Sequence, residues 1–187
     1  MIERTLVVLK PDAVQRELIG KIISRFEDNK LTIMGMKLVK VDPQLAKKHY
    51  TDSPSQIGEM GNKTLHATGL EKSQEIFGTT NPIEIGKQLV EWSRLFIVSI
   101  PVVALVLEGE EAISKVRRIV GFTDPSQAEK GTLRSDLGKD SIARANAEKR
   151  ATENLVHASG SVEEAVQEIN LWFKGNELFP VKENNPN

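Results

Sequence analysis

The sequence predicts an α+β fold of the ferredoxin-like type: a four-stranded antiparallel sheet with helices on one face, plus an irregular or helical insertion. Two observations lead to this expectation. Short apolar runs typical of strands alternate along the chain with segments whose apolar residues recur every three or four positions, as in amphipathic helices. In addition, the 187 residues are enough for one domain with a substantial core.

The chain begins with a strand, a helix and a second strand. Residues 5–9 form an apolar run that Lys10 and Pro11 end, because proline cannot continue a central strand. Apolar residues then recur at helical spacing over residues 19–26. Residues 33–41 alternate loosely between apolar and polar side chains, which predicts the second strand.

A short helix, an irregular segment and a longer helix are expected next. Asp42 can cap a helix over residues 43–50, since a proline occupies the first helical position. Residues 52–82 are rich in Gly, Ser, Thr and Pro and lack a sustained period, so they are interpreted as an irregular insertion. Residues 83–94 are expected to be helical.

The second half of the chain repeats the alternation of strands and helices. Residues 102–107 form a continuous apolar run and are the clearest strand in the sequence. A helix is expected over residues 110–120, closed by Gly121. A long polar loop over residues 121–141 then leads into a charged segment, residues 142–152, that is expected to be helical.

The last helix has a recognisable start. Ser161, followed three residues later by Glu164, forms a capping-box pattern that makes Ser161 the N-cap. The apolar residues beyond it share one helical stripe: Val162, Ala165, Val166, Ile169, Trp172 and Phe173. The polar tail from residue 175 onward is expected to be loose.

Composition excludes several classes of function. Lys and Arg number 25 against 26 Asp and Glu, so the chain has no general charge that would attract nucleic acid or a membrane surface. Without cysteine there is no disulfide, thiolate nucleophile or cysteine metal site. No signal-peptide pattern or membrane-length apolar run is present, and a cytoplasmic location is expected.

The segment around His157 is the most informative part of the sequence. His157 ends a short apolar run just before a helix start, where backbone N–H groups favour anions. Glu168 flanks the buried face of that helix and could accept a hydrogen bond from one imidazole nitrogen, leaving the other free to attack. Ser159 lies two residues beyond His157. On this segment alone, a nucleophilic imidazole and a structurally satisfied histidine remain equally open interpretations.

Cationic residues elsewhere favour anion binding. Lys10 stands at the end of the first strand, and Arg117, Thr123 and Arg134 bracket a loop rich in glycine and hydroxyl residues. Guanidinium groups suit forked contacts to phosphate. The sequence contains neither a P-loop nor a Gly-x-Gly-x-x-Gly motif, and each cation taken alone is compatible with a solvated surface position.

Over residues 4–173 the chain resembles the nucleoside diphosphate kinase family. Seven segments carry this resemblance in register: residues 4–16, 49–50, 101–109, 116–117, 121–125, 131–136 and 154–159. The resemblance implies a single domain over residues 1–175, with insertions at about 53–87 and 139–151 and a C-terminal tail over 176–187. It also implies a homo-oligomer, whether hexamer, tetramer or dimer.

The resemblance further implies a ping-pong transfer of the γ-phosphoryl group of a nucleoside triphosphate to a nucleoside diphosphate, which balances nucleotide pools. His157 matches the phosphorylated histidine; Glu168 and Ser159 match residues that orient it, and Tyr50 matches a neighbour of the catalytic lysine and histidine. The positions that hold phosphates and sugar match Lys10, Arg117, Thr123, Arg134 and Asn154. Magnesium is expected to arrive with the nucleotide rather than in a protein cage. Neither a membrane nor a specific nucleic acid is an expected partner.

Departures from the family pattern keep two alternatives open. Gly160 stands where the family usually has aspartate, and the first insertion covers the region of the aromatic residue that normally stacks on the base, for which Phe77 is a candidate by residue type. One alternative is a nucleotide-binding regulatory relative that has lost transfer. The other is a ferredoxin-like binding module, although the sequence offers no aromatic platform for RNA. His49 is expected at the surface.

Overall fold

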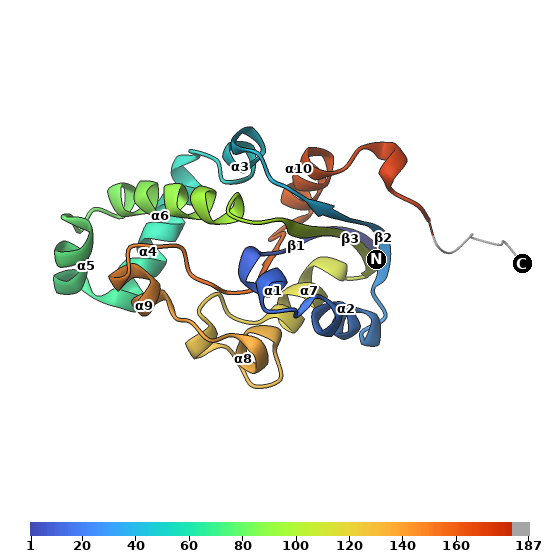
Figure 1. Cartoon of the computed structure of the whole chain (residues 1–187), viewed down its shortest axis with the longest axis horizontal. Coiled ribbons are helices and arrows are strands. Elements are labelled where there is room, and N and C mark those ends of the chain that lie inside the picture. Colours follow the sequence, from blue (N-terminus) through green and yellow to red (C-terminus); the bar gives the residue numbers. More distant parts are fainter. Residues whose placement is uncertain (181–187) are drawn as a thin grey trace, which may run out of the picture.

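The four-stranded antiparallel sheet is confirmed. In the computed structural model, which describes residues 1–180, the strand order is β2-β3-β1-β4 (Figure 1). The strands are β1 (Ile2–Leu9), β2 (Thr32–Val39), β3 (Val102–Glu110) and β4 (Val156–Ala158). Because β1 lies between β3 and β4, the strand that precedes Lys10 pairs directly with the strand that carries His157.

Ten α-helices surround this sheet in the described part of the chain. They are α1 (Pro11–Gln15), α2 (Ile19–Asp28), α3 (Pro43–His49), α4 (Pro54–Thr68), α5 (Leu70–Phe77), α6 (Pro82–Ile97), α7 (Ala112–Val120), α8 (Leu133–Leu137), α9 (Ile142–Ala147) and α10 (Val162–Trp172). Two 3₁₀ turns, Pro125–Gln127 and Gly175–Glu177, complete the description. The N-cap role of Ser161 is confirmed, because its Oγ accepts a hydrogen bond from the Glu164 backbone N–H.

Helices cover both faces of the sheet rather than one. Alternate residues of β1 and β3 pack on one side against α2 and α7, and on the other side against α3 and α10 (Figure 1). The physical reason is visible in β1, where residues 6–9 are all fully buried, so that both faces of the strand are apolar. A strand of this kind needs cover on each side.

The segment predicted to be irregular, residues 52–82, contains helices α4 and α5. The prediction failed because α4 packs through glycine rather than through an apolar stripe. A Cβ atom on Gly61 would lie 1.9 Å from the carbonyl oxygen of Pro82, and one on Gly86 would lie 2.0 Å from that of Ile57. The backbones of α4 and α6 therefore touch directly, and hydrophobic periodicity does not report such a contact.

Three smaller expectations also need correction. The polar loop 121–141 contains α8. The helix expected over residues 142–152 is shorter, because α9 ends at Ala147. The start of the tail is ordered, because the Phe179 N–H donates to the Met34 carbonyl and Lys37 pairs with Glu177. Residues 181–187 lie outside the described part of the chain. No helix within residues 1–180 is long and apolar enough to cross a membrane.

The glycine contact between α4 and α6 yields a stability prediction. We expect Gly86→Ala to lower the free energy of unfolding by about 1–3 kcal/mol, because the added methyl group overlaps the Ile57 carbonyl. Gly20→Ala is the matched control: this helical glycine has nothing within 4 Å of an added Cβ, so stability should stay equal or rise by up to about 1 kcal/mol. Urea unfolding of both variants checks this, and wild-type stability of Gly86→Ala would contradict the packing account.

Candidate active site

The backbone places His157 through a strained turn before β4. Leu155 has a positive φ of 68°, a conformation that costs a residue with a Cβ about 1–2 kcal/mol. Asp12 stabilises this turn, since its Oδ2 accepts a hydrogen bond from the Leu155 N–H at 2.9 Å. The Lys10 N–H donates to the Leu155 carbonyl at 2.8 Å. Two residues later, His157 pairs with Val8 of β1 and turns its ring toward a cavity.

A carboxylate holds the imidazole of His157. The distance from His157 Nε2 to Glu168 Oε1 is 2.7 Å, and Ser159 Oγ donates to Glu168 Oε2 at 2.6 Å. Ser159 Oγ in turn accepts the Leu6 N–H at 3.2 Å. Because a carboxylate accepts hydrogen bonds, it favours the tautomer with the proton on Nε2, which leaves the Nδ1 lone pair free. The predicted arrangement of His157, Ser159 and Glu168 is therefore present.

His49 is buried in this site, so its expected surface position was wrong. Its ring packs edge-on against His157 with centroids 4.4 Å apart, and Trp172 Nε1 donates to its Nδ1 at 3.3 Å. Burial lowers the pKa of His49 well below 6.5, and His157 and Lys10 lower it further. The neutral ring does not compete with His157 for the charge of Glu168. Sequence spacing gave no signal, because α3 and α10 bring His49 into the site from distant parts of the chain.

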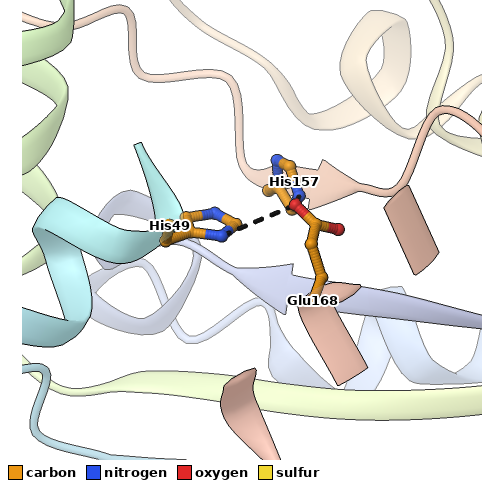
Figure 2. Close-up of side chains that lie close together, drawn as sticks. All are labelled: His49, His157 and Glu168. Carbon is orange, nitrogen blue, oxygen red and sulfur yellow. Dashed lines mark hydrogen bonds and ion pairs between the residues drawn. The ribbon is translucent and has the colours of Figure 1, made fainter. Parts of the chain in front are cut away.

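These residues also form the one cluster in residues 1–180 whose ligand atoms are close enough for a metal ion. The atoms of His49, His157 and Glu168 lie within 4.8 Å of one another, and Figure 2 shows the three side chains converging. Three of the contacts in this cluster are hydrogen bonds within the protein: His157 with Glu168, Glu168 with Ser159, and His49 Nδ1 with Trp172. His49 Nε2, by contrast, is buried without a hydrogen-bonding partner.

A second network holds the cationic residues next to the imidazole. Lys10 Nζ donates to Asn154 Oδ1 at 2.8 Å, and Asn154 Nδ2 donates to the Thr123 carbonyl at 2.9 Å. The guanidinium of Arg134 donates to three carbonyls, those of Gly121, Asn154 and Val156. This hydrogen bonding ties the loop after α7 to the segment that precedes β4.

The buried cations have lowered pKa values. Burial lowers the pKa of Lys10 to about 8, and the neighbouring Arg134 adds to the effect while Asp12 opposes it. Burial likewise lowers the pKa of Arg134 to about 10. Tyr50 stays protonated, because burial and then the charge of Glu168 raise its pKa. Three ionisable groups with shifted pKa values beside one imidazole are typical of a functional site.

The cavity in front of His157 has a volume of about 680 Å³, within the range of small-molecule sites. Its lining includes the sequence-predicted residues Lys10, Tyr50, Arg117, Thr123, Arg134, Asn154 and His157. Ser159 and Glu168 do not line the cavity and lie behind the imidazole. The fold thus brings together residues that lie far apart in the sequence and that would not indicate a binding site if taken one at a time.

Phe77 is not part of this site. It is buried in a separate cluster with Ile85 and Leu89, and its ring stacks on Trp92 with centroids 5.5 Å apart. Sequence reasoning also missed a set of cavity residues on α4, namely Gln56, Glu59, Met60 and Lys63. Gly160 is compensated locally, because its N–H donates to Glu164 Oε2 at 2.6 Å and so places a carboxylate beside it.

The fold and the site together define a group-transfer enzyme in which an oriented imidazole faces a cation-lined pocket for an anionic substrate. Comparison with protein families identifies which one. The model of the family described as nucleoside diphosphate kinase matches residues 3–57 and 84–178. The chain belongs to the nucleoside diphosphate kinase family and is a transferase that moves phosphoryl groups between nucleotides.

Individual relatives agree with this assignment. A nucleoside diphosphate kinase of Pyrobaculum aerophilum is 41% identical over 181 residues, spanning 95% of this chain and 98% of the relative. One from Staphylococcus saprophyticus is 40% identical over 181 residues, spanning 97% and 94%.

Solved structures show the same likeness. An NDP kinase crystal structure from Pyrobaculum aerophilum superposes with a TM-score of 0.90 at 38% identity, covering 96% of this chain and all of that one. A transition-state mimic of the Borrelia burgdorferi nucleoside-diphosphate kinase, with bound vanadate and ADP, has a TM-score of 0.77 at 32% identity and covers 98% and 94%.

The lowered pKa of Lys10 predicts how nucleotide affinity depends on pH. As pH rises through about 8, Lys10 loses its proton and its positive charge, so affinity for an anionic nucleotide should fall. We expect a loss of about tenfold in ADP affinity between pH 7 and pH 9, measured by calorimetry. Lys10→Met should bind weakly at both pH values. An equal pH dependence in wild type and Lys10→Met would contradict the assignment to Lys10.

Proposed function

We propose that this chain transfers the γ-phosphoryl group of a nucleoside triphosphate to a nucleoside diphosphate through a phosphohistidine on Nδ1 of His157. The observation that carries the proposal is the 2.7 Å contact between His157 Nε2 and Glu168 Oε1. That contact occupies one nitrogen and fixes the ring, so the other nitrogen acts as the nucleophile.

The two half-reactions balance without a change in protonation. The Nδ1 lone pair attacks the γ-phosphorus, the bond to the bridging oxygen breaks, and the diphosphate leaves with that electron pair. The ring keeps its Nε2 proton, and the negative charge of Glu168 stabilises the positive charge that develops on the imidazole. In the second half, a terminal phosphate oxygen of a diphosphate attacks the phosphorus, and the electron pair of the P–N bond returns to Nδ1.

Phosphate and sugar contacts are assigned to the cavity residues that the family resemblance also marks: Lys10, Arg117, Thr123, Arg134 and Asn154. Their location around one cavity supports this assignment. Over a full cycle, the phosphate bond broken in the donor and the phosphate bond formed in the acceptor are equivalent. Catalysis therefore rests on positioning and charge stabilisation. Tyr50 is a neutral hydrogen-bonding group beside them, and Ser159 holds Glu168.

Magnesium is proposed to bind through the nucleotide phosphates. The cavity is lined by cations, an amide and hydroxyl groups, and its two carboxylates, Glu59 and Glu164, are already engaged by Lys63 and by the Gly160 N–H, which suits an ion held by the substrate. Once bound, the ion supplies charge neutralisation on the phosphate oxygens. Lys10 and Arg134 supply the same kind of stabilisation from the protein.

Further properties are inferred from family membership. We infer one catalytic domain over residues 1–175 with insertions at about 53–87 and 139–151, assembled as a homo-oligomer (hexamer, tetramer or dimer). The substrates are nucleoside di- and triphosphates, and the role is balancing nucleotide pools in the cytoplasm. The proposal of a first insertion is supported by the gap in the family model, which leaves residues 58–83 unmatched.

Phosphoenzyme labelling tests the proposal. Incubation with γ-labelled ATP should give an acid-labile, alkali-stable label that passes to an added nucleoside diphosphate. His157→Ala should carry no label, whereas His66→Ala, which changes an exposed histidine of α4, should be labelled like wild type. An unlabelled wild type that still binds nucleotide would instead favour the regulatory relative that has lost transfer.

A further inference from the structure

Helix α4 presents two different faces. The buried residues Ile57, Gly61 and Thr64 form one face. Within this face, Gly61 contacts Pro82, the first residue of α6, and Ile57 contacts Gly86 of the same helix. The other face lines the catalytic cavity through Gln56, Glu59, Met60 and Lys63, whose spacing of three, one and three residues is that of one helical stripe. Three of these four residues, from Glu59 onward, lie in the segment that the family model leaves unmatched.

Several contacts fix the position of α4 against the cavity. Its backbone contacts α6 through Gly61 and Gly86, and at its C-terminal end Thr68 Oγ1 accepts a hydrogen bond from Asn146 Nδ2 of α9 at 3.0 Å. Gln56, near the N-terminal end, is tied to Thr51 by a hydrogen bond of 2.6 Å. Contacts at both ends and in the middle hold the stripe toward the cavity.

Lys63 is placed to reach a substrate. It borders the main cavity and also two adjoining depressions, one beside Phe122 and Thr123 and one beside Asn154. Its ammonium pairs with Glu59, one helical turn earlier, and both side chains are about half exposed or more. An exposed pair of this kind is worth little, so exchanging it for a phosphate costs little. Lys10 and Arg134, by contrast, are already hydrogen-bonded to Asn154 and to backbone carbonyls.

We propose that Lys63 is a nucleotide-positioning residue, which leaves Glu59 and contacts the polyphosphate of the bound nucleotide, while Glu59 weakens binding by competing for Lys63. The inference rests on the proposed function, because it assumes that the nucleotide occupies the cavity in front of His157. The electrostatic surroundings fit the proposal: Lys63 lowers the pKa of Glu59, and Arg117, which also lines the cavity, lowers it further. The insertion thus adds to the phosphate-binding residues a cation, Lys63, that the family resemblance did not include.

Steady-state kinetics with ADP as the acceptor test this inference. Lys63→Gln should raise the KM for ADP about fivefold and leave kcat within about twofold, because a contact made equally in the ground and transition states affects binding alone. Glu59→Gln should lower the KM about two- to threefold. The double variant should resemble Lys63→Gln, since Glu59 acts through Lys63. Lys72→Gln on α5, an exposed lysine that does not line the cavity, is the matched control.

The outcomes separate this inference from the proposed function. If Lys63→Gln has wild-type KM values while phosphoenzyme labelling of His157 is intact, the role of Lys63 is refuted and the proposed function stands. If the wild type carries no label on His157, the proposed function itself fails. Equal thermal unfolding of the Lys63→Gln and Lys72→Gln proteins keeps a folding defect from being read as a loss of binding, and a KM increase of the same size in Lys72→Gln would also overturn the inference.

Discussion

The hydrogen bond between His157 Nε2 and Glu168 Oε1 is the interaction on which the site depends. It joins the sheet to a helix that covers it, since His157 lies on β4 beside β1 and Glu168 lies on α10, on the opposite face of the sheet from α2 and α7. Ser159 fixes the second oxygen of the carboxylate and is itself anchored on the backbone of β1. Imidazole orientation is therefore a product of sheet pairing and of helix docking together.

Burying charge beside that imidazole is costly, and the structure shows how the cost is met. Lys10 and Arg134 lie in low-dielectric surroundings, which lower their pKa values, yet both are hydrogen-bonded to protein groups. Asp12 compensates part of the positive charge and holds Leu155 in its left-handed conformation. In such surroundings fixed cations act strongly on phosphate, since little water screens them. Asp12 therefore links the strained turn at Leu155 to the cations beside His157.

Much of this could be read from the sequence, and the failures have physical causes. Continuous apolar runs predicted β1 and β3, and Ser161 with Glu164 predicted the start of α10 correctly. The cover on the second face was missed although the unbroken run over residues 102–107 implied it. Helix α4 was missed because it docks through glycine. His49 was misplaced because no local pattern distinguishes a histidine at a helix end from one that tertiary packing buries.

The nitrogen of His157 that becomes phosphorylated shows whether Glu168 orients the ring. Phosphorus NMR of the ATP-treated, denatured enzyme distinguishes phosphohistidine substituted on Nδ1 from that substituted on Nε2. We expect Nδ1-phosphohistidine at residue 157, because Glu168 holds Nε2. A phosphoryl group on Nε2 would contradict it, since that atom would then have to leave the carboxylate that is proposed to orient the ring.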